Sequence, residues 1–234
     1  MGVIDHHALQ SSTIVTSLPI YMDIRPWGSM STIIGHTFIT QRKRPSTSTA
    51  GMLLCAILSD TLNLCGPTTT DYDRQLVSIL AELAGVIDIQ ALANEQFRAK
   101  SHELASCTAD TLVNGDQKCF KFHTSSFQGE IAFAVIETTD DEVLIARSSE
   151  LKDSLLVSKQ KKGLKGLFLA VVNIVLMRST LILCSEAERS LAVAAWDHCA
   201  ATGDTMNIGN EVSRKLNFVP RLTNAIKDGW KMPE

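Results

Sequence analysis

A mostly apolar run from Gly166 to Cys184 constrains the fold of this chain more than any other segment. Asn173 and Arg178 interrupt the run, and its longest unbroken part is far shorter than the roughly 20 residues that a membrane-spanning helix needs. The run is rich in Val, Ile and Leu, which is typical of strands buried on both faces. The sequence therefore predicts two buried neighbouring strands that turn at Met177–Thr180.

The spacing of apolar residues changes near residue 118. Helical periodicity precedes this point, over Ile33–Ile39, Ala50–Leu58, Thr70–Leu83, Ile89–Lys100 and Ala109–Val113. After it, Lys118–Phe122 and Ile131–Glu137 alternate like antiparallel strands, and helices are expected at Ser148–Lys161 and Glu186–Ala201. We therefore expect an α/β fold: a partial parallel-sheet domain over residues 1–116, followed by a smaller α+β domain with a mixed sheet over residues 117–234.

The chain starts in an unusual way. Gly2-Val3-Ile4 has the pattern of the tail of a buried parallel strand, and Ile20–Ile24 predicts a second strand. Open α/β sheets bind their ligands just beyond the carboxyl ends of parallel strands, where polar residues begin here. Because a domain does not usually begin inside a central strand, we expect that the residues that would precede this first strand are missing from the sequence.

Composition limits the classes of function. The net charge is −3 and 20% of the residues are charged, so the chain does not have the basic surface of a general polyanion binder. A phosphate site would have to be a local cluster of cations. None of the six cysteines forms a C-x-x-C pair, which predicts free thiols in a reducing compartment. With no signal peptide visible, we expect a cytoplasmic protein that does not bind a membrane.

Three polar clusters could carry chemistry, although each has an ordinary structural explanation as well. Asp5-His6-His7 offers metal-capable and acid–base groups at a strand end, or it is a solvated terminus. Asp60 ends an apolar helix, where a carboxylate either binds a cation or caps a turn. Arg214 and Lys215 suit a phosphate clamp, but such pairs usually lie on solvated surfaces.

The order of these clusters is more informative than any one of them. The chain reads I-D-H-H, P-W-G-S-M-S-T, A-G-M-L-L-C-A-I-L-S-D-T-L-N, G-P-T-T-T-D-Y-D and V-S-R-K-L-N-F-V-P-R-L. In these five blocks it resembles the DHH phosphoesterase superfamily, in the branch with a DHHA2 C-terminal domain. That branch holds the family II inorganic pyrophosphatases and the eukaryotic-type exopolyphosphatases, including prune-like proteins. The resemblance implies a DHH domain over residues 1–116 and a DHHA2 substrate-binding domain over residues 117–234.

The resemblance also implies roles for single residues. His6 matches the histidine that binds a divalent metal, and Asp5 is the acid beside it. His7 matches the histidine that contacts phosphate or the nucleophilic water, which makes Asp5 and His7 the catalytic candidates. Asp60 matches a metal-binding aspartate. The last block matches residues that bind the substrate phosphates, Arg214 and Lys215, and the second block places Gly28 and Ser29 in a turn that shapes the site.

Two departures from the family pattern are visible. The H-x-x-x-D-x-D-like motif and a further aspartate motif are missing from the sequence, so His6 and Asp60 leave the dinuclear Mn²⁺ or Mg²⁺ site of the family incomplete. Pyrophosphatases of the family also carry a substrate lysine between the domains, where this chain has Ser106 or Cys107. The segment from Ala99 to Lys118 is more similar to the exopolyphosphatases.

The resemblance therefore predicts metal-dependent hydrolysis of phosphoanhydride bonds, with release of phosphate from inorganic polyphosphate as the first expectation. A family II inorganic pyrophosphatase is the alternative, and an inactive truncated or prune-like binding protein is another. Nucleic acid is not an expected partner, since the glycine-rich G-G-G-H run of the related phosphodiesterases is absent. The expected partner is polyphosphate or pyrophosphate, and no oligomeric state follows from the sequence.

Overall fold

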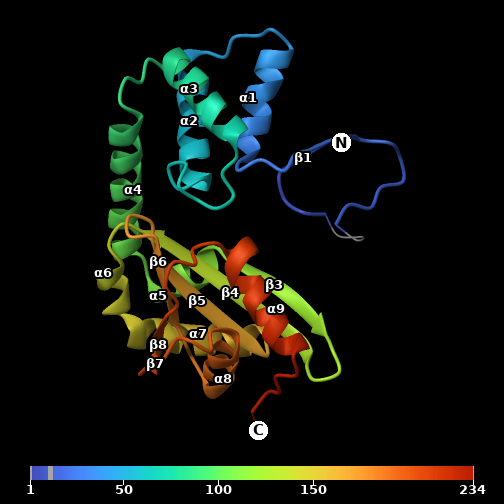
Figure 1. The fold of residues 1–234 in the computed structure, drawn as a ribbon, viewed down its shortest axis with the longest axis vertical. Coiled ribbons are helices and arrows are strands. Elements are labelled where there is room, and N and C mark those ends of the chain that lie inside the picture. The colour runs from blue at the N-terminus through green and yellow to red at the C-terminus, as the bar shows by residue number, and fades with distance from the viewer. Residues whose placement is uncertain (1, 10–12, 234) are drawn as a thin grey trace. The chain divides into compact units, whose positions relative to one another are not determined.

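The computed structural model describes residues 2–9 and 13–233, which form two compact units that divide between Gln96 and Phe97 (Figure 1). In the first unit, strands β1 (Gly2–Asp5) and β2 (Tyr21–Ile24) pair in parallel, with Asp5 opposite Ile24. The expected parallel strands are therefore present. Burial of β1 was predicted and is wrong, because this two-stranded sheet leaves Ile4 38% exposed.

Three helices pack together beside these strands (Figure 1): α1 (Met30–Thr40), α2 (Thr47–Asp60) and α3 (Asp71–Ala84). Each begins at a hydroxyl side chain that accepts a backbone N–H of the first turn, the usual role of an N-cap residue. The caps are Ser29, Ser46 and Thr70. The apolar faces meet in a core that contains Ile33, Leu54, Ile57, Leu58, Leu76 and Leu80.

Helix α4 (Ile89–Ser106) is longer than expected and crosses the division between the units. Its last turns and helix α5 (Ala109–Gly115) belong to the second unit, where Leu104, Leu112 and Val113 join the core beneath the sheet. The compact units therefore divide before the change of pattern near residue 118. The change of pattern coincides with the first strand of the second sheet, whereas helical residues before this strand already pack against the sheet. The predicted domain boundary at residues 116–117 stays a prediction.

The second unit is built on a six-stranded mixed sheet in the order β3-β4-β5-β6-β8-β7. The strands are β3 (Gln117–His123), β4 (Gln128–Thr138), β5 (Gly166–Asn173), β6 (Arg178–Ile182), β7 (Ala201–Thr202) and β8 (Thr205–Asn207). Only β4 and β5 pair in parallel, through a crossover that contains α6 (Asp141–Ile145) and α7 (Ser148–Lys162). The predicted fold class, a small parallel sheet followed by a mixed sheet, is confirmed.

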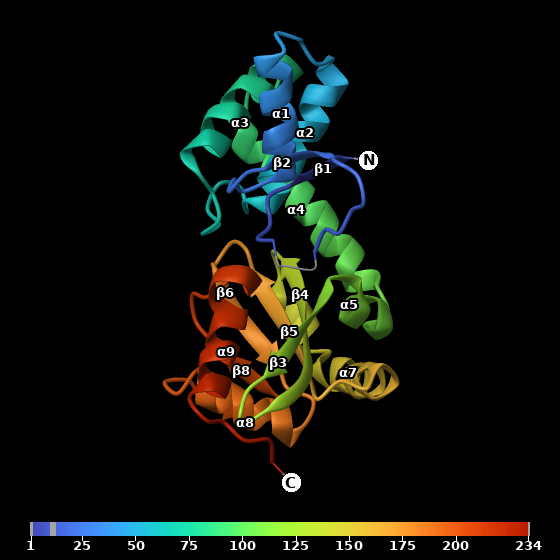
Figure 2. The same ribbon diagram turned by 90° about the vertical axis from the view of Figure 1, so that its right-hand side faces the viewer.

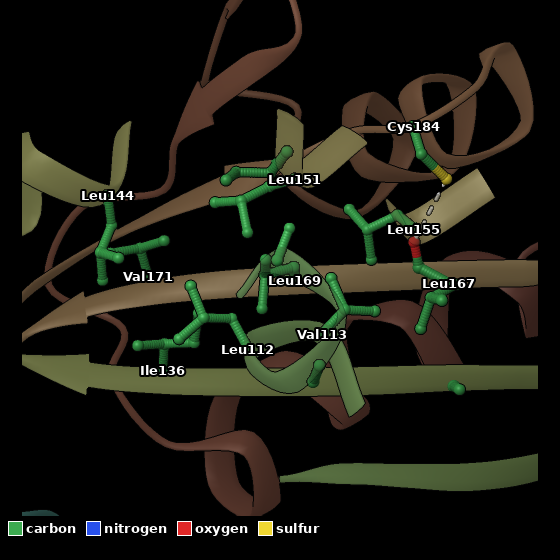
Figure 3. Close-up of a cluster of buried hydrophobic side chains, with 14 of the residues drawn as sticks. Leu112, Val113, Ile136, Leu144, Leu151, Leu155, Leu167, Leu169, Val171 and Cys184 are labelled. Atoms are coloured by element: carbon green, nitrogen blue, oxygen red, sulfur yellow. Dashed lines mark hydrogen bonds between the residues drawn. The ribbon is translucent and has the colours of Figure 1, made fainter. Parts of the chain in front are cut away.

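Helices cover both faces of this sheet (Figure 2). On one face, α5 and α7 enclose an aliphatic core in which Leu112, Leu155, Leu169 and Cys184 are buried (Figure 3). On the other, Phe133 stacks between Phe168 and Phe218, at centroid distances of 5.6 and 5.1 Å. Cover on both faces explains why all eight residues of β5 are buried, as its continuous apolar sequence predicts.

The end of the chain differs from expectation. Helix α8 (Glu186–Ala195) stops before Ala201, because Trp196 turns into the core and donates its indole N–H to Glu211. The short β7–β8 hairpin follows, with Gly203 at a φ of 58° in its turn. The chain then forms a π-helix (Arg214–Phe218) that is continued by α9 (Val219–Lys227).

No single helix in the described ranges has both the length and the apolar character to cross a membrane. Helices α3 and α4, which meet at a 92° bend, pass that test only as a pair, by length and composition.

Candidate active site

Asp5, His6 and His7 form a compact group at the carboxyl end of β1. The Asp5 Oδ1 atom accepts the backbone N–H groups of His6 at 2.7 Å and His7 at 3.2 Å, and lies 2.7 Å from His7 Nδ1. Partial burial raises the pKa of the Asp5 carboxyl, but the hydrogen bonds from the His7 ring and the two backbone N–H groups outweigh it. The net pKa is lowered, so Asp5 is ionised at neutral pH.

The orientation of both imidazoles follows from their partners. His6 Nδ1 lies 3.0 Å from the carbonyl oxygen of Trp27, and a carbonyl can only accept, so Nδ1 carries the proton and Nε2 is left with its lone pair. The same argument applies to His7, whose Nδ1 faces the Asp5 carboxylate. Both rings therefore present Nε2 for coordination or proton transfer.

These three residues are the potential metal-binding group of the described ranges. One potential ligand atom from each lies within 4.8 Å of the others. Imidazole nitrogen and carboxylate oxygen suit Mn²⁺ and Co²⁺, and a hydrogen bond on the second ring nitrogen is typical of metal-binding histidines. The residues present therefore fit a divalent metal.

Asp60 lies at the last position of α2, is exposed, and is not part of the group around His6. Its Oδ2 atom accepts the hydroxyl of Ser29 at 2.7 Å. Ser29 ends the turn Trp27-Gly28-Ser29, which we call the 27–29 turn. At the start of this turn, the carbonyl oxygen of Trp27 accepts a hydrogen bond from His6 Nδ1–H. The two predicted metal ligands are thus hydrogen-bonded to opposite ends of one three-residue turn.

Arg214 and Lys215 differ from each other in the second unit. The Arg214 guanidinium donates to the Asp116 carboxylate and carbonyl, both at 2.8 Å, and to the Phe133 carbonyl at 3.3 Å. Its side chain is 14% exposed. Lys215 is exposed and makes no hydrogen bond or ion pair with any described residue. Both belong to the π-helix, a rare element that is frequent at functional sites.

Comparison with known proteins identifies the family. The DHHA2 domain model matches residues 94–225, which is more than half of the chain. A relative from Deinococcus radiodurans, named "Probable manganese-dependent inorganic pyrophosphatase", is 34% identical over 220 residues, covering 94% of this chain and 69% of the relative. The chain belongs to the DHHA2-domain family that includes the family II inorganic pyrophosphatases.

Two further comparisons support this membership of the DHHA2 family. A cobalt-dependent inorganic pyrophosphatase of Clostridium perfringens is 31% identical over 97% of this chain and 39% of its own length. A crystal structure from Methanococcus jannaschii, assigned as a family II inorganic pyrophosphatase, superposes with a TM-score of 0.82 at 25% identity, over 96% of this chain and 72% of that one. The resemblance to the DHH superfamily is confirmed, and the metals in the relatives' names agree with the expected divalent cofactor.

Sequence reasoning missed two features that surround the site in this DHHA2-family chain. The Trp27 ring stacks on Tyr72 at 4.4 Å, and the edge of His36 meets both rings at 5.2 and 5.4 Å. Asp73, which the sequence shows only as an acid in the first turn of α3, is fully buried. The motif blocks P-W-G-S and G-P-T-T-T-D-Y-D contain Trp27, Tyr72 and Asp73, but no local pattern reveals that the two blocks meet.

Proposed function

We propose that this protein is a divalent-metal-dependent hydrolase of phosphoanhydride bonds, with inorganic pyrophosphate as its substrate. The observation that carries the proposal is the group of Asp5, His6 and His7, in which hydrogen bonds to Trp27 and Asp5 engage both Nδ1 atoms and leave both Nε2 atoms available. The relatives that match most of the chain are pyrophosphatases by name, which favours pyrophosphate over longer chains.

His6 through Nε2 and Asp60 through its carboxylate are the residues that would hold metal. When bound, the metal supplies a hydroxide nucleophile and neutralises charge on the phosphoryl oxygens. The Asp5 carboxylate accepts Nδ1–H of His7 at 2.7 Å and so fixes the orientation of the ring. His7, through Nε2, would pass a proton to the leaving phosphate while its bond to Asp5 is retained.

Two cations of the second unit, Arg214 and Lys215, are the residues to which we assign phosphate binding. Lys215 is exposed with no partner among the described residues, so its ammonium is available to a phosphate oxygen. Arg214 holds the π-helix against Asp116 and has part of its guanidinium edge left for phosphate. We therefore assign direct phosphate contact mainly to Lys215, with Arg214 as its support.

Exopolyphosphatase activity is the second candidate. The observation that favours it is the position expected for the substrate lysine of pyrophosphatases, which holds Ser106 or Cys107. The Ser106 hydroxyl donates back to the Glu103 carbonyl at 2.7 Å, so this position supplies no cation. A cytoplasmic location and the absence of nucleic-acid and membrane partners stay predictions.

Phosphate release from pyrophosphate, tripolyphosphate and long-chain polyphosphate tests the proposal, with Mn²⁺, Co²⁺ or Mg²⁺ added separately. We expect pyrophosphate to be the best substrate, and His6→Ala and Asp60→Asn to abolish turnover. His102→Ala is the control, because His102 is an exposed histidine outside the motif blocks. Preference for polyphosphate would favour the second candidate. Binding of pyrophosphate without hydrolysis would indicate a binding protein, and turnover that survives both substitutions would overturn the assigned site.

A further inference from the structure

Asp73 is a fully buried carboxylate to which the proposed chemistry gives no role. Its Oδ2 atom accepts the backbone N–H of Thr70 at 2.7 Å, the Thr70 hydroxyl at 2.6 Å and the backbone N–H of Gly28 at 2.9 Å. Its Oδ1 atom accepts the Thr32 hydroxyl at 2.5 Å. No Lys, Arg or His in the described ranges pairs with it, so these four donors balance the buried charge.

Helix capping explains only half of these bonds. Asp73 is the third residue of α3, and its contacts with Thr70 form a capping box. The hydrogen bonds to Gly28 and Thr32 span 45 and 41 residues of sequence and do not cap the N-terminus of α3. They fix the 27–29 turn and the first turn of α1 to the start of α3.

The turn fits closely against this carboxylate. A Cβ atom on Gly28 would lie 2.8 Å from Asp73 Oδ2 and 2.8 Å from a methyl group of Thr61, so any side chain here would force these neighbours or the turn to shift. The residue next to Asp73 also holds the turn, since the Tyr72 ring stacks on Trp27 at 4.4 Å. The start of α3 therefore restrains both the backbone of the turn and its aromatic side chain.

We propose that Asp73 is a positioning residue for the metal site, and this inference rests on the proposed function. Through Gly28 it fixes the 27–29 turn, whose Trp27 carbonyl sets the tautomer of His6 and whose Ser29 hydroxyl orients Asp60. Asp73 is not one of the proposed metal ligands or phosphate-binding residues. Its effect is to keep two ligands from distant parts of the sequence in a fixed relation to one another.

Asp73→Glu separates positioning from capping. Glutamate is the favoured residue at this position of a capping box, so α3 should keep its cap. The extra methylene has no space at a fully buried site that holds Gly28 and Thr32 at once, so the 27–29 turn should shift. Asp71→Glu is the matched control, because it is the same substitution at an exposed position in the same helical turn.

Two measurements on the full chain decide the proposal. By calorimetry, Asp73→Glu should weaken Mn²⁺ binding about tenfold or more, the usual effect of losing support for a metal ligand, while Asp71→Glu should not change it. Asp73→Asn should keep much of the affinity, since its amide oxygen still accepts Gly28 and its amide N–H can donate to Thr32. Circular dichroism should show the same helix content in all variants.

The second measurement is independent of metal and of activity. In ¹⁵N NMR spectra of metal-free protein with labelled histidine, wild-type His6 should carry its proton on Nδ1, and Asp73→Glu should give a mixture of tautomers. If wild-type His6 is protonated on Nε2, the proposal is overturned whether or not the variant folds. It is also overturned if Asp73→Glu leaves both the tautomer and the Mn²⁺ affinity unchanged. Absence of Mn²⁺ binding by wild type, with the tautomer shift still present, would count against the proposed function and leave the positioning role standing.

Discussion

Replacing Arg214 and replacing Lys215 should give separate defects, although the two residues are adjacent. The Arg214 guanidinium joins the π-helix to Asp116 and to the carbonyl of Phe133, a fully buried residue of β4. Lys215 is exposed and has no partner among the described residues. Arg214→Ala should therefore lower stability, whereas Lys215→Ala should lower phosphate affinity at unchanged stability.

The size of the stability loss follows from the contacts. Hydrogen bonds that involve a charged group contribute about 1.5–3 kcal/mol each, and leaving a buried acceptor unpaired adds to the loss. The Asp116 side chain is 56% exposed, so its ion pair with Arg214 is screened and contributes less than about 1 kcal/mol. We expect a loss of about 2 kcal/mol for Arg214→Ala, which corresponds to a fall in Tm of about 4–8 °C for a chain of this size. Lys215→Ala should change stability by less than about 0.5 kcal/mol.

Thermal unfolding followed by circular dichroism measures the change in stability. Calorimetric titration with pyrophosphate in the presence of Mn²⁺ measures the change in phosphate affinity. Lys215→Ala should weaken pyrophosphate binding about tenfold, the loss expected for one charge-assisted hydrogen bond. Arg221→Ala is the control, since this partly exposed arginine follows in the same segment and pairs with Glu211. An unchanged Tm for Arg214→Ala, or a Lys215→Ala variant that binds pyrophosphate as well as wild type, would refute the reasoning.

Three further predictions concern the second unit. Leu155→Ala should lower the free energy of unfolding in urea titrations by about 2–5 kcal/mol, because Leu155 is fully buried. The control Leu156→Ala, at the 39% exposed neighbour, should lower it by less than about 1 kcal/mol. Equal losses would contradict the described core. Burial raises the pKa of the Cys184 thiol to about 12, so iodoacetamide should alkylate the exposed Cys65 in native protein and reach Cys184 only after unfolding, as mass spectrometry would show. Because the unfolded thiol has a pKa of about 8.5, the stability that buried Cys184 contributes is full below that pH and falls as the pH rises toward 12, and Cys184→Ala should reduce this alkaline loss.

Local chemistry in the sequence determined most of the secondary structure. The hydroxyl residues Ser29 and Thr70 cap α1 and α3 through local contacts, since a cap needs only a partner two or three residues away. The continuous apolar sequence of β5 predicted a strand buried on both faces. The motif blocks predicted the DHHA2 family, which the comparisons confirm. The proposed roles of His6, His7, Asp60, Arg214 and Lys215 remain predictions.

Tertiary structure decided what depends on partners far apart in the sequence. The parallel pairing of β4 with β5 needs a crossover of two helices, which neither strand encodes. Arg214 meets Asp116 across 98 residues, which converts an apparent surface cation into a packed one. Asp73 meets Gly28 across 45 residues, so an acid that reads locally as a helix cap also fixes the turn between two predicted metal ligands. Periodicity and capping are set within one or two helical turns, whereas these contacts exist only after the elements pack and buried polar groups must find partners.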